Sequence, residues 1–172
     1  MKIITTLLIT LSLLVNKVSS AQEFNVPTDY QFNSKEDYAK YEKDIIDAAN
    51  WLLATPLNEQ LNKRKEVSAF VVKWINGSPT VNVELNPTIM GFEKKNNGML
   101  VLFMASCAKF VLENNYSTDM RAKHRAALRD LIKVYKQGKG IEKDKKMEKL
   151  IKSDEKGKID QWLAENLKIE GH

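Results

Sequence analysis

Hydrophobic residues recur with the period of an α-helix along most of this chain. After Ser34, apolar residues appear every three or four positions as far as Leu52, which is the pattern of a helix with one buried face. Ser34 and Asp37 form a variant of the capping box that begins many helices. We therefore predict a first helix that begins at Ser34 and ends at Thr55-Pro56.

The same Thr55-Pro56 pair predicts the start of a second helix. Threonine caps helices well, and proline is favoured at the first helical position. Apolar residues at helical spacing continue through residues 57–75, and Gly77 is suited to end the helix. A second long helix, over 56–77, is therefore expected to follow the first with almost no loop.

Two more long helices and two short ones complete the predicted helical content. Residues 99–112 are apolar nearly all round, which predicts a central helix buried on most sides. Residues 118–137 have an amphipathic pattern that stops at Gly138, and short apolar repeats follow at 147–151 and 159–167. The predicted fold is all-α: a compact bundle of four main helices plus two short C-terminal helices, with one minor extended element.

That extended element is the segment SPTVNVELNP, residues 78–87. Val81, Val83 and Leu85 alternate with polar residues, which is the period of a β-strand. A strand needs hydrogen-bond partners for its backbone, and within the chain residues 23–27 have the most suitable pattern. If residues 80–85 pair with them, the segment holds the N-terminus in place. If not, Val81, Val83 and Leu85 leave an open edge that can accept a strand from another protein, and Val81, Val83 and Glu84 are the candidate binding residues there.

The first 21 residues have the three parts of a secretory signal peptide. Lys2 precedes an apolar run from Ile3 to Val15, and the small residues Ser19-Ser20-Ala21 follow. The apolar run is too short to span a bilayer, although a retained N-terminal anchor is the alternative. We predict cleavage near Ala21 and a secreted or periplasmic protein with no transmembrane segment in the mature chain.

The expected organisation is a signal peptide (1–21), an extended lead-in (22–33), a single helical domain (34–168) and a frayed C-terminus (169–172). Removing the signal peptide takes away two lysines and no acidic residue, which lowers the net charge by two units from +5. Mild charge on an exported chain argues against binding to nucleic acid. Cys107 is the one cysteine, so no disulfide forms within the chain, which suits a bacterial envelope.

The most regular charge pattern lies within residues 118–137. Basic residues recur there at four-residue intervals, with one further lysine beside them. This basic stripe consists of Arg121, Arg125, Arg129, Lys133 and Lys136. A stripe of this kind can attract an anionic ligand or an acidic envelope protein. The alternative is a solvated helix face whose bases pair with acids on neighbouring helices.

Residues suited to catalysis or metal binding are few. His124 falls in the middle of an apolar helix face, where a histidine is more often a packed core residue than a catalytic base. Cys107 lies in the most apolar helix, where a thiol is inert. Glu84 is the acidic residue in the unusual segment, and a glycan hydrolase would use such a carboxylate. Met120 and His124 are one helical turn apart and are weak candidates for a copper or redox site.

Together these patterns favour a binding protein over an enzyme. We predict a secreted or periplasmic helical protein without catalytic activity or cofactor, which binds through the basic stripe or through the extended segment. Two alternatives stay open at this point. One is a cell-envelope hydrolase that acts on glycan through Glu84, and the other is a metal or redox carrier that uses Met120 and His124.

Overall fold

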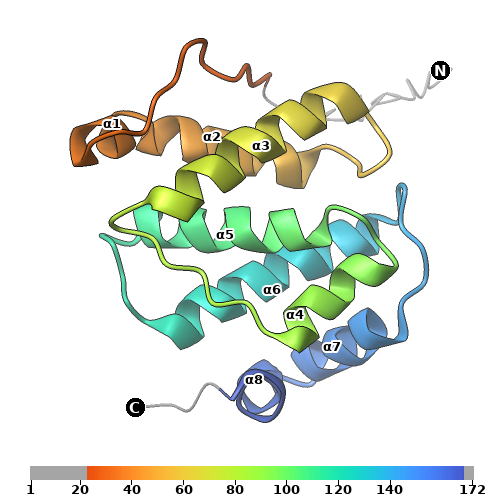
Figure 1. Ribbon diagram of the computed structural model, residues 1–172. Helices are drawn as coiled ribbons and strands as arrows, with labels where there is room; N and C mark the ends of the chain where they lie inside the picture. Colours follow the sequence, from red (N-terminus) through yellow and green to blue (C-terminus); the bar gives the residue numbers. More distant parts are fainter. Residues whose placement is uncertain (1–22, 169–172) are drawn as a thin grey trace, which may run out of the picture.

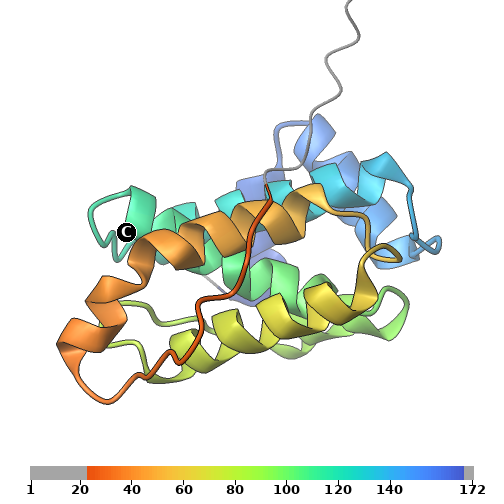
Figure 2. The same ribbon diagram turned by 90° about the horizontal axis from the view of Figure 1, so that it is seen from above.

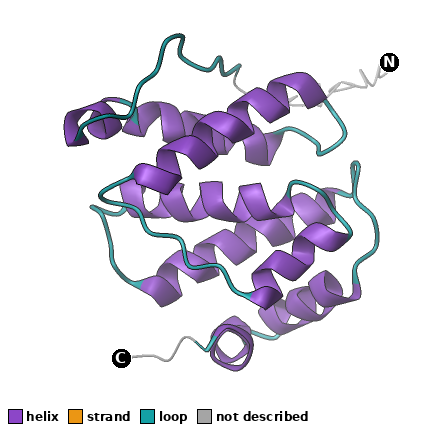
Figure 3. Ribbon diagram, viewed as in Figure 1, coloured by secondary structure: helices purple, strands orange, loops and turns teal. Residues whose placement is uncertain are grey.

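A computed structural model describes residues 23–168, and within this range every regular element is helical (Figures 1 and 3). The predicted signal peptide (1–21) and the predicted frayed end (169–172) lie outside the described residues. The all-α prediction is confirmed. The elements are α1 (Lys35–Lys40), α2 (Glu42–Ala54), α3 (Leu61–Gly77), α4 (Pro87–Met90), the 3-10 helix η1 (Gly91–Lys94), α5 (Met99–Glu113), α6 (Met120–Gln137), α7 (Lys145–Glu155) and α8 (Ile159–Leu167).

The helices are arranged in layers around α5 (Figure 1). Helices α2 and α3 cover one side of α5, and α6 packs along another side with the most extensive contact in the fold. The short helices α7 and α8 pack against α6 and against each other. One hydrophobic core therefore runs from α2 and α3 through α5 and α6 to the C-terminal helices.

Helix α5 is buried along its whole length, as its sequence predicts. Every residue from Met99 to Leu112 is buried or partly buried, because neighbouring elements cover most of the surface of the helix. The polar residue Ser106 lies inside this helix, and its hydroxyl donates a hydrogen bond to Asp130 Oδ2 on α6 at 3.1 Å. This bond satisfies a buried hydroxyl that would otherwise reduce stability.

The predicted start of the second helix at Thr55-Pro56 is wrong. Helix α2 does end at Thr55, but α3 begins five residues after Pro56, at Leu61. Arg64 explains the delay, because its Nη2 donates hydrogen bonds to the carbonyl oxygens of Leu52, Thr55 and Pro56. The turn at residues 56–60 is thus folded around a side chain from the following helix.

The predicted first helix is divided at Tyr41, where α1 ends and α2 begins. The carbonyl of Tyr38 would accept a bond from residue 42 in a continuous helix. It instead accepts bonds from the N–H of Tyr41 at 3.2 Å and from Nε1 of Trp74 on α3 at 3.0 Å. The capping box at Ser34 is confirmed, since its hydroxyl accepts from the N–H of Asp37 and the Asp37 carboxylate accepts from the N–H of Ser34.

The N-terminal lead-in is held by aromatic packing rather than by strand pairing. It crosses the face formed by α2 and α3 (Figure 2). The rings of Phe24, Tyr30 and Phe32 lie 6.3, 4.9 and 6.0 Å from the ring of Phe70 on α3. Phe70 is fully buried. Among the described residues there is no strand, so residues 23–27 and 80–85 form no β-ladder, and the extended element is not a strand of a sheet.

The predicted helices near the C-terminus are confirmed with small changes of boundary. Helix α6 begins after Asp119, whose side chain accepts a bond from the N–H of Ala122, and ends at Gly138 in the left-handed region with φ 71°. Helices α7 and α8 match the two short apolar repeats. Between residues 23 and 168, no helix combines the length and the hydrophobicity needed to cross a bilayer.

Substitution of Phe70 tests whether the aromatic cluster stabilises the fold. We expect Phe70→Ala to lower the free energy of unfolding by about 3–5 kcal/mol, because it removes a large buried ring and leaves a cavity. The measurement is urea denaturation followed by circular dichroism. Leu61→Ala is the control, since Leu61 is 62% exposed and should change stability by less than about 0.5 kcal/mol. Equal losses for the two variants would contradict the cluster's role.

Candidate functional site

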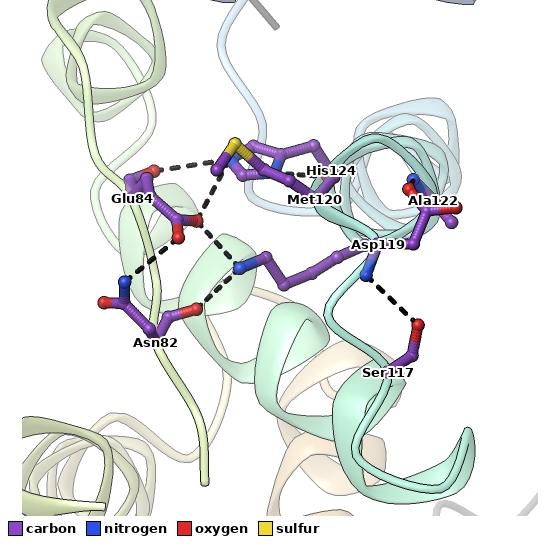
Figure 4. Close-up of polar contacts among 8 residues, drawn as sticks. Asn82, Glu84, Ser117, Asp119, Met120, Ala122 and His124 are labelled. Atoms are coloured by element: carbon purple, nitrogen blue, oxygen red, sulfur yellow. Dashed lines mark hydrogen bonds and ion pairs between the residues drawn. The ribbon is translucent and has the colours of Figure 1, made fainter. Parts of the chain in front are cut away.

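The extended segment, residues 80–85, lies against the first turns of α6 (Figure 4). Lys123 on α6 fixes it there, because its Nζ donates to the backbone carbonyl of Asn82 at 2.6 Å and to Glu84 Oε2 at 2.7 Å. The Lys123 side chain is only 8% exposed, whereas that of Glu84 is 35% exposed. Asn82 Nδ2 also donates to Glu84 Oε1 at 3.1 Å, so both carboxylate oxygens of Glu84 have partners.

His124 makes a second link between α6 and the extended segment. Its Nδ1 lies 2.7 Å from the carbonyl oxygen of Met120, and its Nε2 lies 3.4 Å from the carbonyl oxygen of Glu84. The imidazole is almost fully buried and lies against the ring of Phe103, with 5.4 Å between centroids. His124 is therefore a packed residue whose two ring nitrogens both face backbone oxygen atoms.

Apolar side chains on and beside the segment differ in exposure. Val81 is buried and Val83 is partly buried, so one face of the segment belongs to the core. Leu85 and Met120 are 41% and 39% exposed, and Met90 at the end of α4 is 52% exposed. Figure 4 shows Met120 beside His124 and Glu84. The segment thus combines an extended backbone with exposed apolar side chains.

The basic stripe on α6 is largely engaged in ion pairs. Its bases reach acids on α7 and α8 and one acid on α6 itself. The pairs are Arg125–Asp160 at 3.2 Å, Arg129–Asp154 at 3.1 Å, Lys133–Asp130 at 3.0 Å and Lys136–Glu155 at 2.7 Å. Arg121 also has an interaction partner. The structure therefore places Arg125, Arg129 and Lys136 opposite acids of the C-terminal helices, whereas Lys133 pairs within α6.

The residues considered for catalysis are either engaged by other side chains or buried. The Glu84 carboxylate is occupied by Lys123 and Asn82. Cys107 is completely buried in α5, and this burial raises the pKa of its thiol far above the usual range. A thiol in this state is a poor nucleophile. No arrangement of nucleophile, base and orienting acid is formed by these side chains.

The soft pair Met120 and His124 lies near one carboxylate, since His124 Nε2 is 4.0 Å from Glu84 Oε2. His124 Nδ1 is occupied by the Met120 carbonyl rather than directed toward the Met120 sulfur. Within residues 23–168, no group of three or more histidine, cysteine, aspartate or glutamate side chains is placed so that it could hold a metal ion. The geometry thus adds no support to the copper hypothesis.

Lys123 is the residue that sequence reasoning missed. It lies among the basic residues of 118–137, but it falls outside the four-residue repeat of the stripe. A signal was nevertheless present, because Lys123 is four residues before Ala127 and next to His124. A lysine on the apolar face of a helix is buried when the helix packs, so its charge needs an acceptor or a carboxylate as partner. That partner is 39 residues away in the sequence.

Substitution of Lys123 tests whether its side chain holds the extended segment in place. We expect Lys123→Met to lower the free energy of unfolding by about 1.5–3 kcal/mol, because Glu84 and the Asn82 carbonyl lose a charged donor. Partial exposure of Glu84 lets water replace part of this interaction. The control is Lys133→Met, whose side chain is 73% exposed in its ion pair, for which we expect a loss below about 1 kcal/mol.

Urea denaturation gives the two stabilities, and hydrogen exchange of residues 80–86 reports on the segment itself. Faster exchange there in Lys123→Met but not in Lys133→Met is the expected result. Unchanged exchange in both variants would show that the segment is held by other contacts.

Comparisons with protein-family models, with curated proteins and with solved structures found no significant match for this chain. The residues of this chain and their geometry are therefore the evidence for its function. The features with the most specific geometry are the extended segment fixed on α6 and the loops that surround the start of α3.

Proposed function

We propose that this protein is an exported, non-catalytic binding protein that accepts an extended segment of a partner protein alongside residues 80–85. One observation carries the proposal. Within the described part of the chain, no backbone–backbone hydrogen bond joins residues 80–85 to another segment. The segment is extended and fixed by α6, but its backbone has no strand beside it.

The edges of the segment support this reading. The carbonyl groups of Asn82 and Glu84 face side chains of α6. In an extended chain the backbone groups of successive residues point to opposite edges, so those of Val83 and Leu85 point away from α6. A partner strand beside that edge would satisfy them, and the exposed Leu85 side chain would contact it. Addition of a strand to an exposed edge is a common way to bind extended peptides.

Other readings have less support. An anion-binding role for the basic stripe competes with its ion pairs to α7 and α8, which would have to break. Hydrolysis through Glu84 competes with the Lys123 ion pair. A copper site at Met120 and His124 competes with the hydrogen bond from the imidazole to the backbone. Strand addition at the edge away from α6 keeps the contacts of Lys123 and His124 with residues 82 and 84.

Export is the first part of the proposal to test. We expect the protein isolated from its native cells to begin at Gln22, because signal peptidase would cut after Ala21. Intact-mass spectrometry of the purified protein gives its N-terminus directly, and cell fractionation gives the compartment. A protein that retains Met1 and stays in the cytoplasm would contradict export but would leave the docking proposal to be judged separately.

Docking is tested by a photo-crosslinking residue placed at Leu85. In native cells we expect crosslinks from position 85 to a segment of a second protein with alternating apolar and polar residues. Val83→Pro should abolish them, because proline removes the N–H that a partner strand would accept from. Val83→Thr is the matched control, since it keeps both the N–H and the branched shape.

The same crosslinker at Leu61, which is also exposed, controls for nonspecific capture. Equal capture from positions 85 and 61, or capture unaffected by Val83→Pro, would contradict docking at this edge. Crosslinks between two copies of this chain would show self-association and would likewise contradict a separate partner. Circular dichroism of each variant confirms that the fold is retained.

A further inference from the structure

A pocket of about 620 Å³ opens at the start of α3, and residues 80–85 are not among its lining residues. One wall is the first turns of α3 with residues 57 and 58. The opposite wall is the chain that leads into α5, residues 93 and 95–98, with Val101 of α5. Gly140 and Glu142 close a third side. The volume lies within the range of pockets that hold small organic ligands, about 300–1,000 Å³.

The walls of this pocket are tied together by buried hydrogen bonds. Asn96 is 3% exposed. Its Nδ2 donates to the carbonyl of Glu142 at 3.0 Å, and its Oδ1 accepts from the N–H of Glu142 at 2.7 Å. These two bonds fix the loop at residues 138–142 against the loop before α5. The pocket is therefore part of the folded structure rather than a gap between mobile loops.

Arg64 brings a buried positive charge to the pocket. It is 8% exposed, and all of its hydrogen bonds are made by Nη2 to backbone carbonyls at the end of α2. Its Nε is enclosed and has no partner among the described residues. The end of a helix carries only about half a negative charge. The carbonyls of α2 and the Trp51 ring, whose centre lies 5.9 Å from Cζ, therefore offset part of the guanidinium charge, and no carboxylate among residues 23–168 forms an ion pair with it.

Three bases and two acids line the pocket, namely Arg64, Lys65, Lys95, Glu93 and Glu142, so its lining carries a small positive excess. Lys65 and Lys95 are exposed and line the pocket. In the region from residue 23 to residue 168, no ion pair joins either lysine or Arg64 to a carboxylate. The carboxylate of Glu93 is already used, since Oε1 accepts from the N–H of Gly98 and Oε2 from the N–H of Leu100, both at 2.8 Å.

One side of the pocket is apolar. Leu57, Leu61 and Val101 contribute to its lining. Leu61 has the largest exposed fraction of the exposed large hydrophobic residues within the described range, at 62%. Such exposure is costly in water, and contact with the apolar part of a ligand would remove it. The pocket therefore offers positive groups and an apolar surface to the same molecule.

We propose that this pocket binds a small organic anion with an oxyanion head group and an apolar body, such as an alkyl carboxylate or an alkyl phosphate. Arg64, Lys65 and Lys95 attract the oxyanion, and Leu57, Leu61 and Val101 contact the apolar part. This site is independent of the docking edge at residues 80–85, so either proposal can fail without the other.

Isothermal titration calorimetry with four probes tests the ligand class. The probes are decanoate, decyl phosphate, decyltrimethylammonium and inorganic phosphate, each below its micelle concentration. We expect saturable binding of decanoate or decyl phosphate, with the tighter of the two identifying the head group. Decyltrimethylammonium should not bind, because its charge has the wrong sign, and inorganic phosphate should bind at least tenfold more weakly because it lacks the apolar body.

Two variants with the same change in net charge locate the site. We expect Lys65→Gln/Lys95→Gln to weaken binding of the decyl anion by about 3- to 20-fold, because two exposed cations near the head group are removed. Lys94→Gln/Lys143→Gln is the matched control, since both lysines are exposed and lie next to lining residues without lining the pocket. It should leave the affinity unchanged within about twofold.

Arg64→Met should weaken binding further, provided that circular dichroism shows a folded protein. If that variant does not fold, the two lysine variants still decide the question. Absence of binding by both decyl anions at millimolar concentration would overturn the proposal. So would equal binding of the decyl cation, or equal effects of the two lysine variants.

Discussion

The fold depends on the need to cover α5 on every side. A helix that is apolar all round is stable in water only when neighbouring elements bury all of its faces. Helices α2 and α3 cover one side, α6 covers another, and α4 with η1 contacts it as well. No residue from Met99 to Leu112 is exposed as a result. The order of the remaining layers follows, because α7 and α8 cover the outer face of α6.

Two buried cations connect this core to the surface, and they differ in an informative way. Lys123 has a carboxylate partner in Glu84 and a backbone carbonyl at Asn82, so its charge is compensated. Arg64 contacts backbone carbonyls and lies 5.9 Å from the centre of the Trp51 ring, and within residues 23–168 it forms no ion pair with a carboxylate. A buried charge without a full counter-charge reduces stability. Lys123 therefore acts as a structural link that fixes the extended segment. Arg64 is instead suited to the anion-binding role that we propose for it.

The two proposed sites occupy loops that a helical scaffold holds in place. The extended segment connects α3 to α4, and the pocket is formed where three loops meet at the start of α3. Binding residues are commonly found on loops positioned by a rigid scaffold. Lys123 of α6 fixes the extended segment. Asn96 fixes the loops that form the pocket. Binding at either site would therefore require little ordering of the chain, which limits the entropic cost.

The sequence alone determined the helices whose signals are local. The capping box at Ser34, the apolar residues of α5 and the stop at Gly138 each involve neighbours within a few residues, so their patterns predicted the elements correctly. Tertiary structure decided what depends on distant partners: the Trp74 bond that divides α1 from α2, the Arg64 bonds that delay α3, and the Lys123 link to residues 80–85. Periodicity shows which face of a helix is buried but not which side chain it will meet. For that reason the pocket emerged only from the folded chain, which also decided that residues 80–85 do not pair with residues 23–27.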